Sequence, residues 1–395
     1  MNQQAAIRYH ATPNEPLLHL FQRMLDEMES KESVEWDADT GTLDPKIYFD
    51  KAIHDKEIAR IFKRVPLCLG HEDQLREPGT MIARDLHGVP LLLVRDRKGQ
   101  IHGLLNVCRH RGARLVAGEE EICKKGALSC PYHAWTYDLD GTLRAVPGAE
   151  AFPGLDKGER SLKRIPVEVR HGLIWAVFDP NATSIDVASF LGGIDDDMAA
   201  MELGPHRFYR QHARRRKTNW KLVMDAFQEF YHIKRLHART IGPFFLDTKS
   251  AGEGVGPHMR VLVGREGLND ARQKAPQDWD MRRDATLTHV IFPNTVIVYH
   301  PDYTSHLGMF PTAADEILFV HTMFTPHEAR NEKEKAHWDR SFALLDGGVF
   351  GEEDLFISEQ IQLGLNSGAN ESFVLGRFEH HLRRFHGHIE RMLKD

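Results

Sequence analysis

Cysteine is scarce in this chain, and the features of secreted, membrane and nucleic-acid-binding proteins are missing. Only four cysteines occur among 395 residues, which argues against a disulfide framework and favours a reducing, cytoplasmic location. No stretch approaches the roughly 20 apolar residues of a membrane span, and residues 1–13 lack the apolar core of a signal peptide. The net charge of −6 argues against a nucleic-acid partner, which normally requires a basic excess.

Two motifs of redox proteins are also absent. The chain has no Gly-x-Gly-x-x-Gly unit for a dinucleotide. It also has no Cys-x4-Cys-x2-Cys set for a plant-type ferredoxin cluster. Any redox centre in this protein must therefore use another set of ligands.

The spacing of apolar residues predicts an α+β protein. Residues 16–29, 56–62 and 185–203 have helical spacing, whereas 81–84, 90–95 and 101–107 are short alternating runs separated by turns. Further strands are expected at 167–169, 173–178, 208–216, 289–292, 295–299 and 317–324. Residues 242–257 read as an irregular loop, and the tail over 332–393 as helical throughout.

The length suits two main domains. We expect a small antiparallel β domain over residues 46–165 and a larger, helix-wrapped sheet domain that forms a pocket over 166–395. Residues 1–45 are expected to be a helical segment that packs on the larger domain.

Two short motifs in the small domain combine cysteine with histidine. They supply Cys108 with His110, and Cys130 with His133. A Rieske [2Fe–2S] cluster needs two thiolates on one iron and two imidazoles on the other. The alternative is a structural zinc site, although such sites more often use Cys-x-x-Cys pairs. Cys123, between the motifs, is expected to be a bystander.

His232 and His237 form a second candidate metal site. On an ideal helix, residues five apart are rotated by about 140°, so a helix end or a loosened turn near Lys234 is needed. Glu229 precedes His232 by three residues and can orient its imidazole. The alternative is a pair of solvated or core histidines.

Together these motifs resemble those of the Rieske non-haem iron oxygenases, in the large (alpha) subunit of the aromatic ring-hydroxylating type. The family carries Cys-x-His-Arg-Gly, Cys-Pro-Tyr-His-x-Trp and Asn-Trp-Lys…Glu-x-Tyr-His-x4-His, matched here at 108–112, 130–135 and 219–237. The resemblance implies a Rieske domain at 46–165 and a helix-grip, START-like catalytic domain at 166–395. It implies cluster ligands Cys108, His110, Cys130 and His133.

The same resemblance implies a mononuclear Fe(II) bound by His232, His237 and one downstream carboxylate. In the acidic run at 352–354, it favours Asp354 as that ligand, with Glu353 second. Seven apolar residues near the iron motif are substrate-pocket candidates, although apolar residues at such positions more often belong to the plain core: Leu222, Phe227, Ile241, Phe244, Phe245, Val296 and Phe310.

The resemblance implies a terminal oxygenase that uses O2 to hydroxylate a small aromatic substrate, as dioxygenases of aromatic hydrocarbon catabolism do. Because a dinucleotide motif is absent, NAD(P)H should be oxidised on a separate reductase, with or without a ferredoxin. A homotrimer or an assembly of trimers, with or without a separate beta subunit, is expected. In it, Glu229 would bridge to His133 of the next subunit.

The chain departs from the family pattern at two places, and one of them keeps another activity open. Asp225-Ala226 stands where relatives often show Glu-Asn, which removes an amide that could form a hydrogen bond near the iron. Glu229 stands where many ring dioxygenases carry Asp. Oxidative demethylation of an aromatic ether or a quaternary amine is therefore the alternative. A non-enzymatic electron-transfer or zinc-structured protein is the alternative from another class, and it would need no second metal site.

Overall fold

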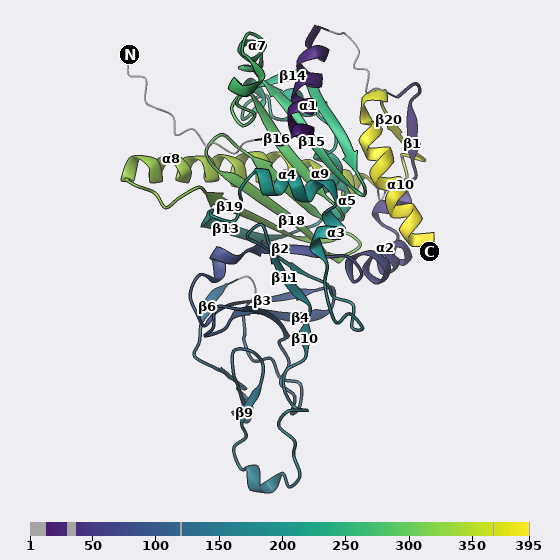
Figure 1. Ribbon diagram of the computed structural model, residues 1–395. Coiled ribbons are helices and arrows are strands. Elements are labelled where there is room, and N and C mark those ends of the chain that lie inside the picture. Colours follow the sequence, from purple (N-terminus) through teal and green to yellow (C-terminus); the bar gives the residue numbers. More distant parts are fainter. Residues whose placement is uncertain (1–12, 30–36, 119–120, 366, 395) are drawn as a thin grey trace. The chain divides into compact units, whose positions relative to one another are not determined.

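A computed structural model of the chain describes residues 13–29, 37–118, 121–365 and 367–394. It divides into two compact units, Phe62–Phe190 and Met1–Ile61 together with Leu191–Asp395 (Figure 1). This division differs from the expected boundaries at 45 and 165, and strand pairing and a buried ion pair explain the difference. Parts of the expected N-terminal segment, residues 1–12 and 30–36, lie outside the described residues.

Residues beyond 165 stay with the small unit because they complete one of its sheets. Strands β11 (Val167–Arg170) and β12 (Leu173–Ala176) pair antiparallel, and β12 also pairs with β2 (Leu67–His71). Residues 46–61 instead belong to the large unit. There the fully buried Glu57 accepts hydrogen bonds from Lys221 Nζ at 2.6 Å and Trp220 Nε1 at 2.9 Å.

The small unit is built of antiparallel β-structure. A five-stranded sheet has the order β10-β5-β4-β3-β6, and two three-stranded sheets have the orders β11-β12-β2 and β7-β8-β9. The remaining bounds are β3 Thr80–Leu86, β4 Val89–Arg95, β5 Ile101–Leu105, β6 Ile122–Lys124, β7 Leu128–Ser129, β8 Thr136–Tyr137, β9 Leu143–Ala145 and β10 Arg164–Ile165. The strands expected from residue 81 onward therefore form, as alternation with turns predicts.

The large unit is organised around a seven-stranded antiparallel sheet of order β13-β19-β18-β17-β16-β15-β14. Its strands are β13 Arg207–Arg216, β14 Phe245–Val255, β15 His258–Arg265, β16 Ala285–Ile291, β17 Thr295–Tyr299, β18 Thr304–Ala313 and β19 Glu316–Thr325. A separate pair joins β1 (Gly41–Leu43) to β20 (Phe373–Leu375).

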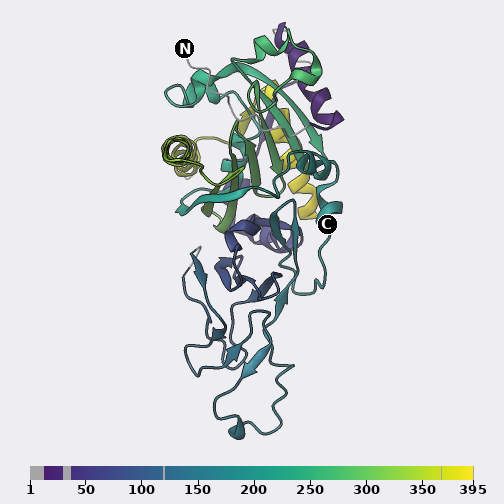
Figure 2. The ribbon, with the colours of Figure 1, turned by 60° about the vertical axis from the view of Figure 1, so that its left-hand side comes forward.

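Helices cover both faces of this sheet. The helices in the described part of the chain are α1 Glu15–Asp26, α2 Lys51–Glu57, α3 Val187–Leu191, α4 Gly193–Ala200, α5 Trp220–Ala226, α6 Ile233–Leu236, α7 Leu268–Ala271, α8 Glu332–Ala343, α9 Leu355–Leu365 and α10 His380–Lys394, and all but α3 belong wholly to the large unit. Helices α8 and α9 join through a π-helix, Leu344–Asp354, into one long helix seen nearly end-on at the left of Figure 2. Helices α1 and α4 lie against the opposite face, where α4 Asp197 binds β15 Arg260.

Two local expectations are wrong. Residues 245–255 form edge strand β14 rather than an irregular loop, because Gly252 and Gly254 leave room for α10 where a Cβ atom would collide with His381 and Arg384. The tail is not helical throughout, since β20 interrupts it and pairs with β1. The α+β class and the helix-covered antiparallel sheet are confirmed. Within the described ranges, no helix has the length and apolar character needed to cross a membrane.

Candidate active site and metal centres

The two cysteine–histidine motifs of the small unit fold into loops of the same form. In each, the cysteine N–H donates to the carbonyl five residues on: Cys108 to Ala113 and Cys130 to Trp135, both at 2.8 Å. In each, the residue four positions after the cysteine donates back to its carbonyl and is left-handed, Gly112 with φ 81° and Ala134 with φ 53°. The repeat presents one thiol and one imidazole from each loop.

The four side chains fit a cluster with two kinds of ligand. Cys108 and Cys130 are 2% and 4% exposed and their thiols interact directly, while burial raises the pKa of Cys108. The rings of His110 and His133 lie 4.8 Å apart, and each has a buried Nδ1 without a hydrogen-bond partner among the described residues. Such orphaned nitrogens, next to a thiol pair, suit two irons with different ligands.

A single zinc ion fits these residues less well. Ligands about 2.0–2.3 Å from one tetrahedral zinc must all lie within roughly 4 Å of one another. Among the described residues, the group of three or more such atoms within 4.8 Å is a different one, His232, His237 and Asp354. Cys123 lies outside both loops, on strand β6.

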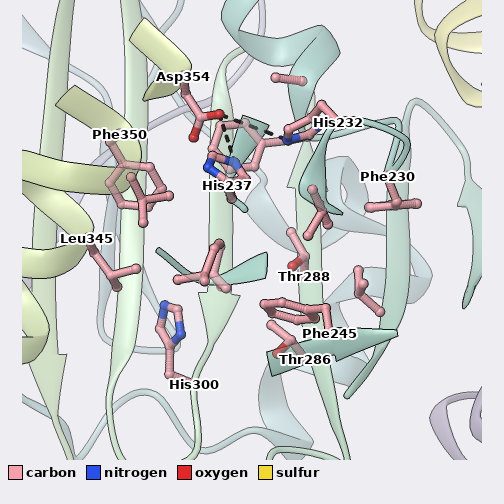
Figure 3. A pocket seen from close by; sticks show the side chains of 17 residues that line it. Phe230, His232, His237, Phe245, Thr286, Thr288, His300, Leu345, Phe350 and Asp354 are labelled. Atoms are coloured by element: carbon pink, nitrogen blue, oxygen red, sulfur yellow. Dashed lines mark ion pairs between the residues drawn. The ribbon is translucent and has the colours of Figure 1, made fainter. Parts of the chain in front are cut away.

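The histidines of the second site bracket a single helical turn. His232 precedes α6 and His237 follows it, so neither has to share a face of a continuous helix. Asp354 is the last residue of the π-helix, a form often found at functional sites. His237 Nε2 lies 3.1 Å and His232 Nε2 3.9 Å from Asp354 Oδ1 (Figure 3).

The donor set and burial of this triad fit a mononuclear iron. Asp354 Oδ1 is buried and has no hydrogen-bond partner within the described part of the chain, as expected of an oxygen that faces a metal. Two imidazoles and one carboxylate form the facial triad of non-haem Fe(II) sites, which leaves coordination positions open.

Two glutamates orient the histidines from behind. Glu229 Oε1 accepts from His232 Nδ1, and its Oε2 accepts from the backbone N–H groups of Tyr231 at 2.6 Å and His232 at 3.2 Å. Glu353 Oε2 accepts from His237 Nδ1 and from Thr240 Oγ1, both at 2.7 Å. The two adjacent acids therefore have different roles. Asp354 faces the proposed metal position, and Glu353 fixes the orientation of the His237 ring.

A buried network anchors the π-helix that carries Asp354. Asp346 accepts from His212 Nδ1 at 2.8 Å and His321 Nδ1 at 3.1 Å, and it pairs with Arg214. Burial raises the pKa of Asp346, but these hydrogen bonds and the charge of Arg214 lower it to about 2. This carboxylate therefore stays ionised and ties the π-helix to strands β13 and β19.

A cavity opens beside the triad and holds about 660 Å³ of empty space, counting the solvent at its mouth. Ligand pockets usually fall between about 300 and 1,000 Å³. Its aromatic lining consists of Phe227, Phe230, Phe245 and Phe350. Apart from the triad, its polar lining consists of Thr286, Thr288 and His300.

The structure keeps three of the seven pocket candidates: Phe227, Ile241 and Phe245. Leu222, Val296 and Phe310 are buried in the core away from the cavity lining, and Phe244 is half exposed. Hydropathy near a motif cannot tell these cases apart, because it does not show which side of a strand meets the cavity. The lining residues that the sequence did not indicate come from several elements: α5, α6, β15, β16, β17, the π-helix and the segments between them.

Comparison with known proteins matches both units. The family described as "Rieske [2Fe-2S] domain" matches residues 65–165, and "Ring hydroxylating alpha subunit (catalytic domain)" matches residues 203–395. The chain belongs to the Rieske non-haem iron oxygenases.

Two curated relatives match this oxygenase over different spans. The carnitine monooxygenase oxygenase subunit of Escherichia coli (strain K12) is 26% identical, covering 90% of this chain and 94% of the relative. The biphenyl 2,3-dioxygenase subunit alpha of Rhodococcus jostii (strain RHA1) is 34% identical, covering 50% of this chain but only 43% of the relative. The solved quaternary ammonium Rieske monooxygenase CntA has a TM-score of 0.77 at 22% identity, covering 90% of this chain and 96% of its own, and shows a shared fold.

Family membership settles the class of protein. This chain is the terminal oxygenase component of a Rieske system and an oxidoreductase that incorporates oxygen from O2. It uses a Rieske [2Fe–2S] cluster and a mononuclear iron. The alternatives of a zinc-structured or purely electron-transferring protein are excluded, because the catalytic domain is present. Oxygenases of this family receive their electrons through reductase or ferredoxin components.

Proposed function

We propose that this oxygenase hydroxylates an aromatic substrate with O2, using electrons from NAD(P)H that a separate reductase delivers, with or without a ferredoxin. The proposed ligands of the two irons of the Rieske cluster are Cys108 with Cys130 and His110 with His133. The proposed ligands of the mononuclear iron are His232, His237 and Asp354. When bound, the cluster supplies single electrons and the mononuclear iron supplies open positions for O2 and its activation.

The lining of the cavity carries this proposal. Four phenylalanines and several aliphatic side chains surround the space beside the triad. Asp354 is the lining's acidic residue, and among the described residues no lysine or arginine lines the cavity. A flat apolar ring gains burial and ring–ring contacts there. A cationic substrate would lose hydration without gaining a free carboxylate as an ion-pair partner, because Asp354 belongs to the triad.

The protein's own residues do three things in this proposal. Glu229 and Glu353 accept the Nδ1–H protons of His232 and His237, which leaves each Nε2 free to bind metal. The phenylalanines exclude water from the reacting centre. Asp346 keeps the π-helix, and with it Asp354, in place.

Demethylation is the second candidate activity. The share of the chain covered by the alignment with one relative favours it. The carnitine monooxygenase subunit aligns with 90% of this chain, against 50% for the biphenyl dioxygenase subunit. An aromatic ring can also stabilise a quaternary ammonium group through cation–π contact. Oxidation of a methyl group on an aromatic ether or a quaternary amine would use the same metal centres.

We also propose a homotrimer, or an assembly of trimers with or without a beta subunit, in which Glu229 meets His133 of the next subunit. The buried Nδ1 of His133 suits the cluster side, which leaves its Nε2 to donate outward. Glu229 Oε2 already accepts two backbone N–H groups, whereas Oε1 accepts one imidazole and keeps a lone pair. The bridge should therefore use Oε1. A head-to-tail contact closes into a ring of three when the rotation is about 120°.

Product analysis with a small substrate panel tests the activity. Purified holoenzyme, NADH, O2 and a surrogate reductase are incubated with toluene, anisole or L-carnitine, with Asp354→Ala as the inactive blank. We expect ring-hydroxylated toluene and turnover only when the reductase is present. Formaldehyde from anisole or L-carnitine, with toluene unchanged, would establish demethylation instead. Steady NADH oxidation by the chain alone would contradict the multicomponent proposal.

A further inference from the structure

The cavity has a second polar end, far from the metal triad. Figure 3 shows His300 and Thr286 at the end opposite Asp354 and His237, with apolar side chains between the two ends. Thr286 lies on β16, and His300 directly follows β17, the neighbouring strand. Polar groups in an otherwise apolar pocket usually fix the orientation of a ligand.

His300 offers hydrogen-bonding capacity that the protein does not use. Among the residues the structure describes, neither ring nitrogen has a hydrogen-bond partner, and Nε2 is buried. The ring stacks on Tyr303 at 4.3 Å. Burial, reinforced by the charges of Arg265 and Arg282, lowers the pKa of His300 well below its usual value. The neutral ring therefore keeps one N–H donor and one acceptor nitrogen at physiological pH.

Thr286 connects the cavity to a half-buried positive charge, the guanidinium of Arg265. Its Oγ1 accepts a hydrogen bond from Arg265 Nη1 at 3.3 Å, and the Arg265 guanidinium lies 5.3 Å from the centre of the Phe245 ring. No carboxylate in the described part of the chain pairs with Arg265 within 4.0 Å. Because Oγ1 accepts from Arg265, the hydroxyl proton of Thr286 is left to donate into the cavity. An uncompensated cation behind it favours an electron-rich oxygen there.

We propose that Thr286 and His300 form a subsite that binds an oxygen acceptor on the aromatic substrate, a carbonyl or a carboxylate, and so turns the opposite end of the ring toward the triad. The subsite deepens the proposed aromatic hydroxylation and rests on it. It makes Thr286 and His300 specificity residues, and Arg265 a positioning residue that acts through Thr286. A buried site that hydrogen-bonds a substrate group discriminates strongly against analogues that lack the group.

Thr288 supplies a matched control. It lies two residues from Thr286 on the same strand and lines the same cavity, closer to the triad. Arg265 donates to Thr286 and not to Thr288. Thr286→Val and Thr288→Val each replace one cavity hydroxyl by a methyl group of similar size. Only the first removes the proposed donor.

Binding of three single-ring probes to the holoenzyme, measured by calorimetric titration without reductase, tests the subsite. Toluene has no oxygen acceptor, acetophenone has a neutral carbonyl and benzoate a carboxylate. We expect Thr286→Val and His300→Phe each to weaken binding of the preferred acceptor probe about tenfold, the usual size of one buried hydrogen bond. Toluene binding should change less than about twofold. Thr288→Val should preserve the wild-type ratio between the probes.

Titration of the wild-type protein distinguishes a carbonyl from a carboxylate as the bound acceptor. It also distinguishes failure of the subsite from failure of the proposed aromatic substrate. Tighter binding of benzoate, lost in Arg265→Gln, identifies a carboxylate, whereas tighter binding of acetophenone identifies a carbonyl. Equal losses for all three probes in Thr286→Val, or no loss in either variant, would overturn the subsite alone. Wild-type binding of toluene but of neither acceptor probe would overturn it as well. If none of the three probes binds, both the proposed subsite and the proposed aromatic substrate class are rejected.

Discussion

The two metal centres of this oxygenase are built in opposite ways. The four proposed Rieske ligands come from two loops of the same form, and all lie between residues 108 and 133. The proposed iron triad joins a single-turn helix at 233–236 to a π-helix that ends at residue 354, more than 100 residues later. Local backbone hydrogen bonds shape the first site, whereas packing of distant elements against one sheet shapes the second.

This difference has a physical consequence for how each site tolerates change. A loop closed by its own backbone hydrogen bonds keeps its form as long as its ligands and its left-handed residue are present. A site assembled from distant segments depends on the side chains that hold those segments together, here Glu229, Glu353 and Asp346. Substitutions of these supporting side chains should therefore weaken the iron site only in part. Loss of any one proposed Rieske ligand should instead abolish the whole cluster.

The largest expected effect tests whether the two centres are independent. Cys108→Ala or Cys130→Ala should abolish the brown colour, the Rieske electron-spin signal and all turnover, because one iron loses half of its thiolate ligands. His232→Ala should keep that signal and lose only the mononuclear iron and the activity. Electron paramagnetic resonance with metal analysis checks both, and bleaching of the cluster by His232→Ala would show that the sites are not separate.

The next effect separates the two neighbouring acids of the iron site. Asp354→Ala should abolish product and mononuclear iron, because a facial triad has no spare protein ligand. Glu353→Ala should instead lower iron affinity by about 10- to 100-fold, the usual effect of losing a partner behind a metal-bound histidine. Iron content after dialysis against a chelator measures both. Glu353→Gln, which retains an acceptor for His237 Nδ1, is the control, and equal loss in Asp354→Ala and Glu353→Ala would contradict this assignment.

A smaller effect concerns the link between the two centres. Glu229→Gln should keep both metals and the oligomer, because an amide oxygen can still accept from His232 Nδ1. It should slow electron transfer from the cluster to the iron, because the proposed bridge to His133 of the next subunit loses its charge. Single-turnover kinetics with the cluster reduced beforehand measures this step. An undiminished rate, or a fully active monomer, would reject the bridge.

The smallest effect is on stability and follows from Asp346. The pKa of Asp346 is lowered to about 2 in the folded protein, below the pKa near 4 of an aspartate in the unfolded chain. The carboxylate therefore contributes fully to the free energy of unfolding above about pH 4, and this contribution is lost as the pH falls toward 2. Asp346→Asn should lower the free energy of unfolding at pH 7 by on the order of 2 kcal/mol. Urea midpoints at pH 7 and pH 3 measure this, and the gap between wild type and variant should narrow at pH 3. A gap that widens in acid would contradict the role given to this carboxylate.

Much of the fold and the positions of the metal motifs could be predicted from the sequence because their signals are local. Alternating apolar runs predicted β3 to β5, and Leu and Met spacing predicted α1. The irregular loop expected over residues 242–257 was wrong, since the sequence cannot show that α10 packs against Gly252 and Gly254. For the same reason β14 was missed, and β1 and β20 could not be paired in advance.

The candidate site divides along the same line. Residue type and spacing alone pointed to Cys108, His110, Cys130 and His133, and to His232 with His237, because ligand chemistry is a property of the side chains themselves. Only the folded chain decided which of two adjacent acids meets the histidines, because a π-helix turns Asp354 toward the metal position and Glu353 toward the back of His237. Only folding brought Thr286, His300 and Phe350 around one cavity, because they lie on separate elements whose contact depends on sheet register and helix packing.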